Sequence, residues 1–367
     1  MAVIKTIKHV EIYKDEHYNT FPTIIRLNDG SYRIGFRQAP DRRTAYDGAI
    51  THVDASSKAV TIRSTDGLDW DTDATIIWDD FFHGVQDPSL NVLRDGTIFV
   101  TYFTWKVYER DDAPAEMKPG TWHRVMDRWI GRMAGCYSIR SADGGQTWDT
   151  PELVELGDVV IRGNSVELED GAILAPFYER EGDTFNVTVG RTEDRGQSWE
   201  RLAVLPGYEG QYHYHEPNLF QTESGKLILF IRSVKLNKEP GEERTASPLF
   251  TSESHDGGRT WSEVKMWPIY SPSPFNALRL ADGRVLLNYG YRLEPYGIRA
   301  LLLDPECTNI GTAPEYVIRD DGYGTDIGYT SAAQLPDGRV LITYYYYLED
   351  GTRYIAGSIC ELERDES

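Results

Sequence analysis

Short apolar runs alternate with polar turns along the whole chain, and many of the runs are rich in β-branched and aromatic residues, as in residues 22–27 and 97–102. Pairs of these runs flank a two-residue turn in which the second residue is glycine. Each pair predicts a β-hairpin with a short primed-type turn. The pattern occurs six times, at Asp29-Gly30, Asp95-Gly96, Asp170-Gly171, Ser224-Gly225, Asp282-Gly283 and Asp337-Gly338.

A second kind of turn follows the pattern Ser/Thr-x-Asp-x-Gly-x-Ser/Thr-Trp. It is complete in residues 141–148, 192–199 and 254–261, and residues 64–70 match it with one residue fewer. Aspartate in such a turn accepts hydrogen bonds from nearby backbone amides, and glycine tolerates positive φ. The tryptophan ring then packs against its neighbours. A repeated tight turn indicates a repeated structural unit.

This second turn resembles the Asp-box of the sialidase and BNR-repeat families, where it lies on the outer rim of six-bladed β-propellers. The resemblance implies an all-β, six-bladed propeller with four antiparallel strands in each blade, and a structural role for the Asp and Trp residues. We expect a single domain over residues 1–367, with residues 4–13 completing the last blade. The fifth and sixth repeats lack a recognisable Asp-box.

Two segments are longer than the repeat requires. Residues 106–135 contain several aromatic and basic side chains, have room for a short helix and form the longest insertion; residues 235–247 form the second. Long loops on a rigid scaffold are often functional, so both are candidate rim or lid elements. For the second segment, the alternative is a solvated surface loop. The side chains that drew attention in the first insertion are Trp122, His123, Arg124, Trp129 and Arg132.

Repeat symmetry predicts which residues converge, because the innermost strand of each blade runs beside the central axis. One predicted ring lies eight positions before each hairpin turn and contains Phe21, Asp87, Arg162, Glu216, Pro274 and Tyr329. A second lies eight positions after it and contains Arg37, Phe103, Tyr178, Arg232, Gly290 and Tyr345. Convergent polar groups in a concave mouth are a default site hypothesis. The alternative is a solvated channel lining.

These residue types suit glycoside chemistry. The phenol of Tyr329 needs a base to act as a nucleophile at neutral pH, and Glu216 can supply one. Arginine binds carboxylates through two parallel hydrogen bonds, which makes Arg162, Arg232, Arg37 and Arg299 candidate anchors for an acidic ligand. Asp41 and Asp47 follow the first inner hairpin and are candidate proton donors.

The set resembles the sialidase active site, which pairs a Tyr nucleophile with a Glu and binds the sugar carboxylate through three arginines. The resemblance implies that Tyr329 is the nucleophile, Glu216 its partner and Asp47 the acid/base. It also implies that Arg232 and Arg299 are the second and third arginines. The family's first arginine opens an Arg-Ile-Pro segment that here reads Thr20-Phe21-Pro22. Arg37 or Arg162 is a candidate replacement, and strict sialic acid specificity is not expected.

Two other sets of residues leave alternatives open. His213 and His215 point to one face of a strand and suit either a metal or, preferably, sugar hydroxyls. Asp87 suits an acid, a base or a strand-start cap. The resulting hypotheses are an exo-acting glycoside hydrolase for a terminal acidic sugar, a uronic-acid polysaccharide lyase using His215 or Tyr329 as base, and a glycan-binding propeller without catalysis.

Composition narrows the classes of molecule that the protein is expected to bind. The net charge of −20 argues against nucleic acid and anionic membranes, and 23 Tyr and 9 Trp suit saccharide-stacking surfaces. The three cysteines show no metal-ligand spacing and indicate a reducing compartment. We expect no metal, no organic cofactor, no signal peptide, no transmembrane span and a cytoplasmic location, with a glycan as substrate. The sequence leaves the oligomeric state and the sugar open.

Overall fold

The strands of a computed structural model, which describes residues 3–114, 122–182 and 184–363, form six antiparallel sheets. These sheets are the blades of a β-propeller, as the sequence predicted. Each blade has four principal strands, which are given below from the innermost outward. Within the described ranges, no helix has the length and apolar character needed to cross a membrane.

The first three blades follow the chain in order. Blade 1 contains β2 (His17–Arg26), β3 (Tyr32–Pro40), β4 (Lys58–Ser64) and β5 (Thr75–Trp78). Blade 2 contains β6 (Gly84–Val92), β7 (Ile98–Glu109), β9 (Trp129–Ser141) and β10 (Glu152–Leu153), with β8 (Trp122–Val125) beside β9. Blade 3 has a divided inner strand and contains β11 (Val159–Ile161), β12 (Val166–Glu167), β13 (Ile173–Glu181), β14 (Thr184–Thr192) and β15 (Glu200–Leu205).

The last three blades continue the same order. Blade 4 contains β16 (Tyr212–Gln221), β17 (Leu227–Lys235), β18 (Pro248–Ser254) and β19 (Lys265–Tyr270). Blade 5 contains β20 (Phe275–Arg279), β21 (Val285–Tyr291), β22 (Gly297–Leu303) and β23 (Glu315–Arg319). Blade 6 contains β24 (Gly328–Gln334), β25 (Val340–Tyr346), β26 (Tyr354–Glu363) and the N-terminal β1 (Val3–Tyr13). Three 3-10 turns are η1 (Arg43–Ala45), η2 (Arg110–Asp112) and η3 (Tyr208–Gly210).

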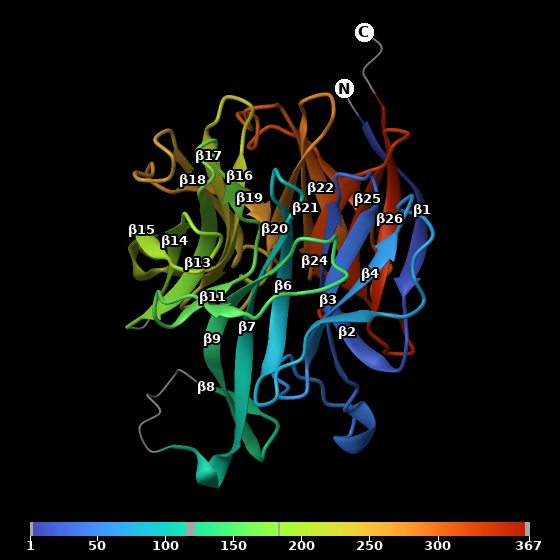
Figure 1. Cartoon of the computed structure of the whole chain (residues 1–367), viewed down its shortest axis with the longest axis vertical. Helices are drawn as coiled ribbons and strands as arrows, with labels where there is room; N and C mark the ends of the chain where they lie inside the picture. Colours follow the sequence, from blue (N-terminus) through green and yellow to red (C-terminus); the bar gives the residue numbers. More distant parts are fainter. Residues whose placement is uncertain (1–2, 115–121, 183, 364–367) are drawn as a thin grey trace.

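The two ends of the chain meet in blade 6. β1 pairs antiparallel with β26, from Val3 opposite Glu363 to Tyr13 opposite Ile355, and Figure 1 shows the two strands side by side. The predicted outer strand is therefore confirmed. Ile12 of β1 is buried in the cluster that joins blades 6 and 1. Closure leaves few unpaired strand edges.

The six inner hairpins differ from the expected turn type. In the first, the Leu27 amide donates to the Ser31 carbonyl and the Gly30 amide donates to the Leu27 carbonyl, at 2.7 and 2.9 Å. Gly30 has a φ of 85°, whereas Asp29 is not left-handed. This is a three-residue loop that ends in a left-handed glycine, not a primed two-residue turn. The same bonds recur in the other five hairpins.

The turns at 64–70, 141–148, 192–199 and 254–261, here called the Asp turns, share a hydrogen-bond pattern. In the third, the Thr192 hydroxyl accepts from the Gly196 amide at 2.7 Å, and Asp194 accepts from the amide and hydroxyl of Ser198. The fifth blade has a related turn, because Asp304 accepts from the amide and hydroxyl of Thr308. The sequence pattern missed it because it lacks the Gly and Trp.

The first predicted insertion is mainly strand. β7 and β9 extend beyond the rest of blade 2, and β8 folds back on β9 with Val125 opposite Trp129. In place of the expected short helix, the described part has only the 3-10 turn η2. Residues 115–121 and the side chains of Trp122, His123 and Arg124 lie outside the description. The second insertion is a loop between β17 and β18 in which Lys235 pairs with Glu242 at 2.7 Å.

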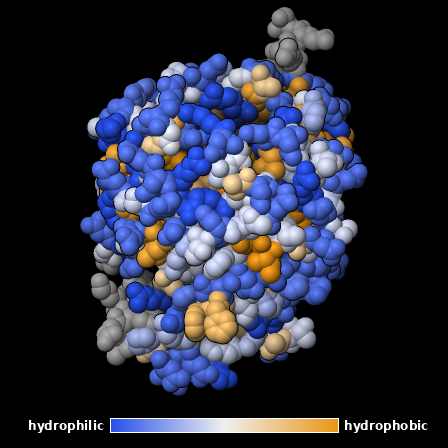
Figure 2. Space-filling model, viewed as in Figure 1, coloured by the Kyte–Doolittle hydropathy of each residue, from blue (hydrophilic) through white to orange (hydrophobic). Residues whose placement is uncertain are grey.

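The surface is mostly polar. Figure 2 shows hydrophilic residues over most of one face, with apolar residues in small separate groups. Small, separate apolar groups are normal for a folded protein surface and mark no interface by themselves.

Candidate functional site

Four inner strands carry a bulge at the same repeat position. Phe21, Asp87, Glu216 and Tyr329 all have positive φ, between 41° and 58°. At each of them the pairing of the inner hairpin shifts register. A bulge redirects the side chain, and strained backbone of this kind clusters at functional sites. The ring predicted from the repeat therefore has a common backbone geometry in four of its six members.

Tyr329, Glu216 and Arg232 come from three different strands and meet in one cluster. The Tyr329 hydroxyl donates to one oxygen of the Glu216 carboxylate, and Arg232 donates to the other. Arg232 also lies 3.3 Å from the Tyr329 hydroxyl. Tyr329 and Glu216 are buried, whereas the Arg232 side chain is 17% exposed and connects the cluster to solvent. Each group thus holds the others in one orientation.

The electrostatics of the cluster keep Glu216 ionised. Burial alone would raise the pKa of Glu216, but the Arg232 charge and the hydrogen bonds from Tyr329 and Arg232 outweigh it and lower the pKa below its ordinary value. Burial and the Glu216 charge raise the pKa of Tyr329 well above that of a free phenol. The resting pair is a neutral phenol hydrogen-bonded to a carboxylate that can accept its proton.

Arg292, which the sequence did not suggest, also lies beside Tyr329. Arg292 lies with its guanidinium carbon 5.1 Å from the centre of the Tyr329 ring and donates to the Tyr345 hydroxyl at 2.8 Å. Arg299 instead donates to the Arg319 carbonyl of the outer strand β23 and lies over Tyr291. Arg292 escaped the repeat count because it lies in the loop after β21, two residues beyond the ring position.

Arg162 connects blades across the axis. Its guanidinium donates to the Pro22 carbonyl at 2.9 Å and to the Thr23 hydroxyl at 3.1 Å, and it approaches the carbonyls of Phe21 and Tyr329. With these donors engaged by the backbone of blades 1 and 6, Arg162 positions Tyr329 instead of replacing the missing first arginine. The suggestion that it anchors a ligand carboxylate is therefore not supported by its contacts.

Arg37 and Asp87 retain unused hydrogen-bonding atoms. Arg37 is fully buried and donates to the His52 carbonyl at 2.9 Å. Its Nε and Nη1, and Oδ1 of Asp87, have no partner among the described residues. Burial raises the pKa of Asp87 to about 7, with the Arg162 charge opposing and the Glu216 charge adding to the rise. These atoms are suited to a polar ligand group, because an unpaired buried polar atom is costly.

The two loop aspartates are placed differently. Asp41 is paired with Arg43 at 2.5 Å, and this pairing outweighs burial and lowers the pKa of Asp41. Asp47 lies exposed after η1 with a φ of 50°. No contact between described residues joins Asp47 to Tyr329 or Glu216. The structure thus does not bring the expected acid/base into the cluster.

Sequence reasoning missed a polar centre beside Phe21. The carboxylate of Asp326 lies 2.8 Å from His52 Nε2 and 2.8 Å from Arg353 Nε, and it accepts from the hydroxyls of Tyr18 and Tyr345. These partners overcome burial and hold the pKa of Asp326 far below its ordinary value. The position of Asp326, two residues before β24 and three before Tyr329, was the available signal.

The histidine pair does not form a metal site with a third ligand in the described chain. His213 Nδ1 accepts from the Phe185 amide at 3.2 Å, and burial lowers the pKa of His213. The ring of His215 lies 4.7 Å from that of Phe185 and 5.5 Å from that of Tyr178, at the wall of the mouth. The one described group with metal-ligand spacing is Asp15, Glu16 and His17, and Asp15 already accepts hydrogen bonds from Tyr13, Asn19 and Gln38.

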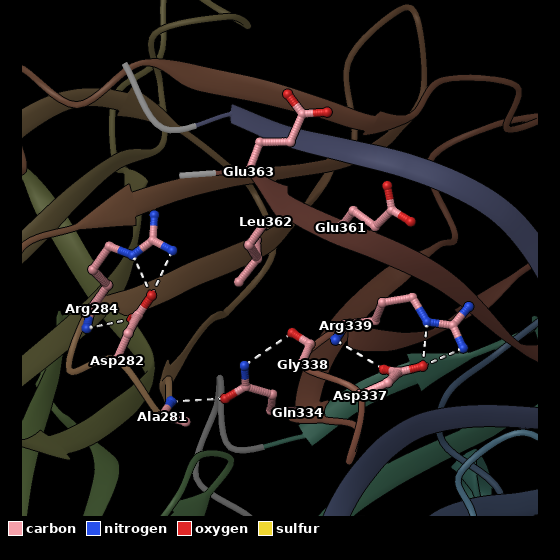
Figure 3. A pocket seen from close by; sticks show the side chains of 10 residues that line it. All are labelled: Ala281, Asp282, Arg284, Gln334, Asp337, Gly338, Arg339, Glu361, Leu362 and Glu363. Carbon is pink, nitrogen blue, oxygen red and sulfur yellow. Dashed lines mark hydrogen bonds and ion pairs between the residues drawn. The ribbon is translucent and has the colours of Figure 1, made fainter. Parts of the chain in front are cut away.

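A hollow of about 670 Å³ lies at the opposite ends of the inner strands, between blades 5 and 6. Figure 3 shows its two aspartates, Asp282 and Asp337, each bound by the arginine two residues later, at 2.6 Å in both cases. These charges are neutralised locally in the hairpin turns. None of the residues that line the hollow belongs to the Tyr329 cluster.

Comparison with known proteins agrees with the fold. Residues 115–303 match the BNR repeat-like domain family. The curated proteins contain no match. A protein of unknown function from Dyadobacter fermentans is 31% identical, with 98% of this chain and 99% of that chain covered and a TM-score of 0.87.

Two glycoside hydrolases are more distant structural neighbours. The NanB sialidase of Streptococcus pneumoniae is 13% identical, with 96% of this chain and 70% of that chain covered and a TM-score of 0.66. The α-L-arabinanase of Penicillium chrysogenum is 13% identical, with 97% and 98% covered and a TM-score of 0.64. At these identities the likeness concerns the fold alone. The chain belongs to the BNR repeat-like family and has the sialidase-like form of the six-bladed propeller.

Proposed function

We propose that the protein is an exo-acting glycoside hydrolase that removes a terminal acidic sugar from a glycan. The observation that carries the proposal is the contact of Tyr329, Glu216 and Arg232, which come from strands of two blades and meet near the propeller axis. Structural neighbours that are glycoside hydrolases support a carbohydrate substrate.

In the proposed reaction, Tyr329 Oη attacks the anomeric carbon while its proton passes to the Glu216 carboxylate. The bond to the leaving oxygen breaks as a carboxylic acid protonates that oxygen, which leaves a glycosyl-tyrosine. Water then attacks the anomeric carbon and gives its proton to the carboxylate that acted as acid, while the bond from that carbon to Tyr329 Oη breaks and the sugar is released. Glu216 returns its proton to Tyr329.

We assign the proton donor to Asp87 in preference to Asp47. Asp87 shares the bulged ring position with Glu216 and Tyr329 and has a free Oδ1 among the described residues. Its pKa of about 7 keeps a proton available near neutrality. Asp47, by contrast, is exposed in a loop outside the bulged ring position.

The sugar carboxylate would lie against Arg232 and Arg292, both of which are close to Tyr329. Phe21 takes the place of the family's first arginine and contacts Tyr329 with ring centres 4.6 Å apart. Losing one buried charged anchor weakens binding by on the order of 2–5 kcal/mol. We therefore propose an acidic sugar held by two arginines and an aromatic wall, distinct from strict sialic acid recognition.

A second candidate is hydrolysis of a neutral sugar by two carboxylates. The observation that favours it is the opposite direction of the Asp87 and Glu216 pKa shifts, since such a pair is typical of an acid and a nucleophile. Here Glu216 attacks and Tyr329 only orients it. The two candidates differ in whether the Tyr329 hydroxyl is essential.

The experiment is a screen of chromogenic glycosides, including sialosides, uronides and arabinosides, with wild type, Tyr329→Phe and Glu216→Gln. We expect each variant to lower kcat about 10²–10⁴-fold while circular dichroism shows that it remains folded. Tyr323→Phe is the control, because Tyr323 is 62% exposed and lies outside the cluster. Wild-type rates in both cluster variants would rule out the hydrolase assignment.

Other outcomes of the same screen separate the remaining functions. Activity that survives in Tyr329→Phe but is lost in Glu216→Gln identifies the two-carboxylate reaction. A product that absorbs in the near ultraviolet identifies a lyase. Saturable glycan binding without product identifies a binding propeller.

A further inference from the structure

Two neighbouring segments at one end of the propeller enclose a cavity that the reaction above does not use. One is the loop between β3 and β4, and the other is the extension of β7 and β9 with the β8 hairpin. Figure 1 shows both projecting at the end opposite the chain termini. The cavity between them has a volume of about 160 Å³.

The walls of this cavity are largely apolar, and its rim is charged. Tyr46 and Val53 line it from the loop, and Met126 and Trp129 line it from the hairpin. The rings of Tyr46 and Trp129 meet edge to face, 5.3 Å apart at 82°. At the rim Arg42 binds Asp54 through two hydrogen bonds, of 2.6 and 3.1 Å. Apolar walls with a few fixed polar groups are typical of small-molecule sites.

One residue, His52, separates the cavity from the groups that pack beside Tyr329. Thr51 and Val53 line it on either side of His52 in the sequence. The His52 carbonyl accepts from Arg37, and its ring lies 5.0 Å from Phe21. Phe21 in turn packs against Tyr329. The cavity is therefore two ring contacts away from Tyr329, on the side of blades 1 and 2.

The close contact of the two segments depends on specific local features. A Cβ atom on Gly131 of β9 would lie 2.2 Å from Val53 Cγ1, so glycine is what allows the loop to approach the hairpin. Met126, in the turn of the hairpin, has a φ of 54°, and such strain persists where the surrounding structure imposes it. The cavity is thus formed by packing between the two segments.

We propose, on the basis of the hydrolase function above, that this cavity binds the first sugar ring on the leaving-group side of the scissile bond. Its volume is well below the roughly 300–1,000 Å³ of pockets for drug-sized ligands. One sugar ring is therefore the expected occupant, with its apolar face toward Trp129 and Tyr46 and its hydroxyls toward Arg42 and Asp54.

The test measures binding without catalysis. Lactose, N-acetylglucosamine and arabinobiose are titrated into the wild-type protein and followed by tryptophan fluorescence and saturation-transfer NMR. For one ring in a small site we expect a Kd on the order of 1–10 mM for at least one probe. Trp129→Ala and Tyr46→Ala should each weaken that binding about tenfold or more. Gly131→Ala tests the cavity without removing an aromatic ring and should also weaken it.

Tyr323→Ala is the matched control, since it removes an exposed aromatic ring outside the cavity. Far-ultraviolet circular dichroism and melting temperatures establish that each variant is folded. The proposal is overturned if no probe binds the wild type saturably, or if the cavity variants bind as well as the control. Cleavage of aryl glycosides with no probe binding would be consistent with the hydrolase function and would contradict the proposed sugar site in the cavity. Probe binding at the cavity without turnover of any glycoside would support the sugar site in the cavity and contradict the hydrolase function.

Discussion

Backbone conformation and side-chain chemistry are separable at the four bulged positions. Phe21, Asp87 and Glu216 are each followed by proline, which has no amide to lose when the strand pairing is interrupted. All four keep the same left-handed conformation, although Phe21 carries no ionisable group. The repeat thus determines the backbone position and conformation from which each side chain extends. The residue type determines the chemistry that the side chain offers.

The raised pKa of Asp87 predicts a specific pH dependence of stability. Because the folded state binds the Asp87 proton more tightly than the unfolded chain does, the resulting stability is present below the ordinary aspartate pKa and is lost as pH rises toward about 7. In Asp87→Asn, the free energy of unfolding should fall less between pH 4 and 7 than in wild type, by on the order of a few kcal/mol. Urea unfolding at several pH values measures this difference, and parallel curves for the two proteins would contradict it.

Arg292, which lies beside Tyr329, and Arg299, which faces β23, make a matched pair for a mutational test. Arg292→Lys should raise KM for an acidic glycoside about tenfold or more, because lysine cannot make the paired contact that guanidinium makes with a carboxylate. Arg299→Lys should leave KM unchanged, since Arg299 faces β23. Steady-state kinetics on the best substrate of the screen compare them. Equal effects of the two changes would show that the assignment is incorrect.

At the scale of elements, the hairpins and the Asp turns have different tasks. The inner hairpins place the bulges at a constant distance from a left-handed glycine, whereas the Asp turns organise the outer strands through side-chain hydrogen bonds. The insertion in blade 2 adds strand length and a cavity without changing the order of the blade. The candidate functional groups therefore lie in the inner strands and in the loops at one end.

Removing an Asp turn should affect stability and not catalysis. Asp194→Ala deletes the acceptor for the amide and hydroxyl of Ser198, so we expect the melting temperature to fall by a few degrees. Asp158→Ala, an exposed position in the same blade, is the control and should leave it unchanged. Differential scanning calorimetry gives both values. A large loss of kcat in folded Asp194→Ala would mean that the turn has another role.

At the scale of the whole molecule, the propeller depends on contact between the two ends of the chain. β1 completes blade 6, and the cluster around Ile12, Leu341 and Ile355 continues into blade 1. The cluster surrounding Tyr329 is part of this same closure, because Tyr329 packs with Phe21 of blade 1. Loosening the closure should therefore disturb the site as well as the fold.

Ile12 and Ile7 test this closure from a single strand. Ile12→Ala removes a buried side chain and should lower the free energy of unfolding by about 2–4 kcal/mol. Ile7 is 42% exposed, so Ile7→Ala should change it by no more than about 0.5 kcal/mol. Urea unfolding measures both, and similar values for the two variants would argue against a closure held by β1.

The sequence by itself determined the architecture. Hairpin turns and Asp turns are local, and their hydrogen bonds lie within a few residues, so they were readable and sufficient to predict six blades, the β1 closure and the ring containing Glu216 and Tyr329. The predicted primed turn of the inner hairpins was wrong, because only the glycine of each turn is left-handed and the residue before it is not.

The tertiary structure alone decided which loop residues reach the axis. Arg292, His52 and Asp326 lie outside the repeat. Arg292 approaches Tyr329, His52 approaches Phe21, and Asp326 binds His52, only because different blades converge there. Arg299 and Asp47 fitted a local pattern but point to β23 or lie exposed in a loop. Spacing along a strand specifies to which face the side chain of a strand residue points. Which group a long side chain or a loop side chain contacts depends instead on the packing of distant segments.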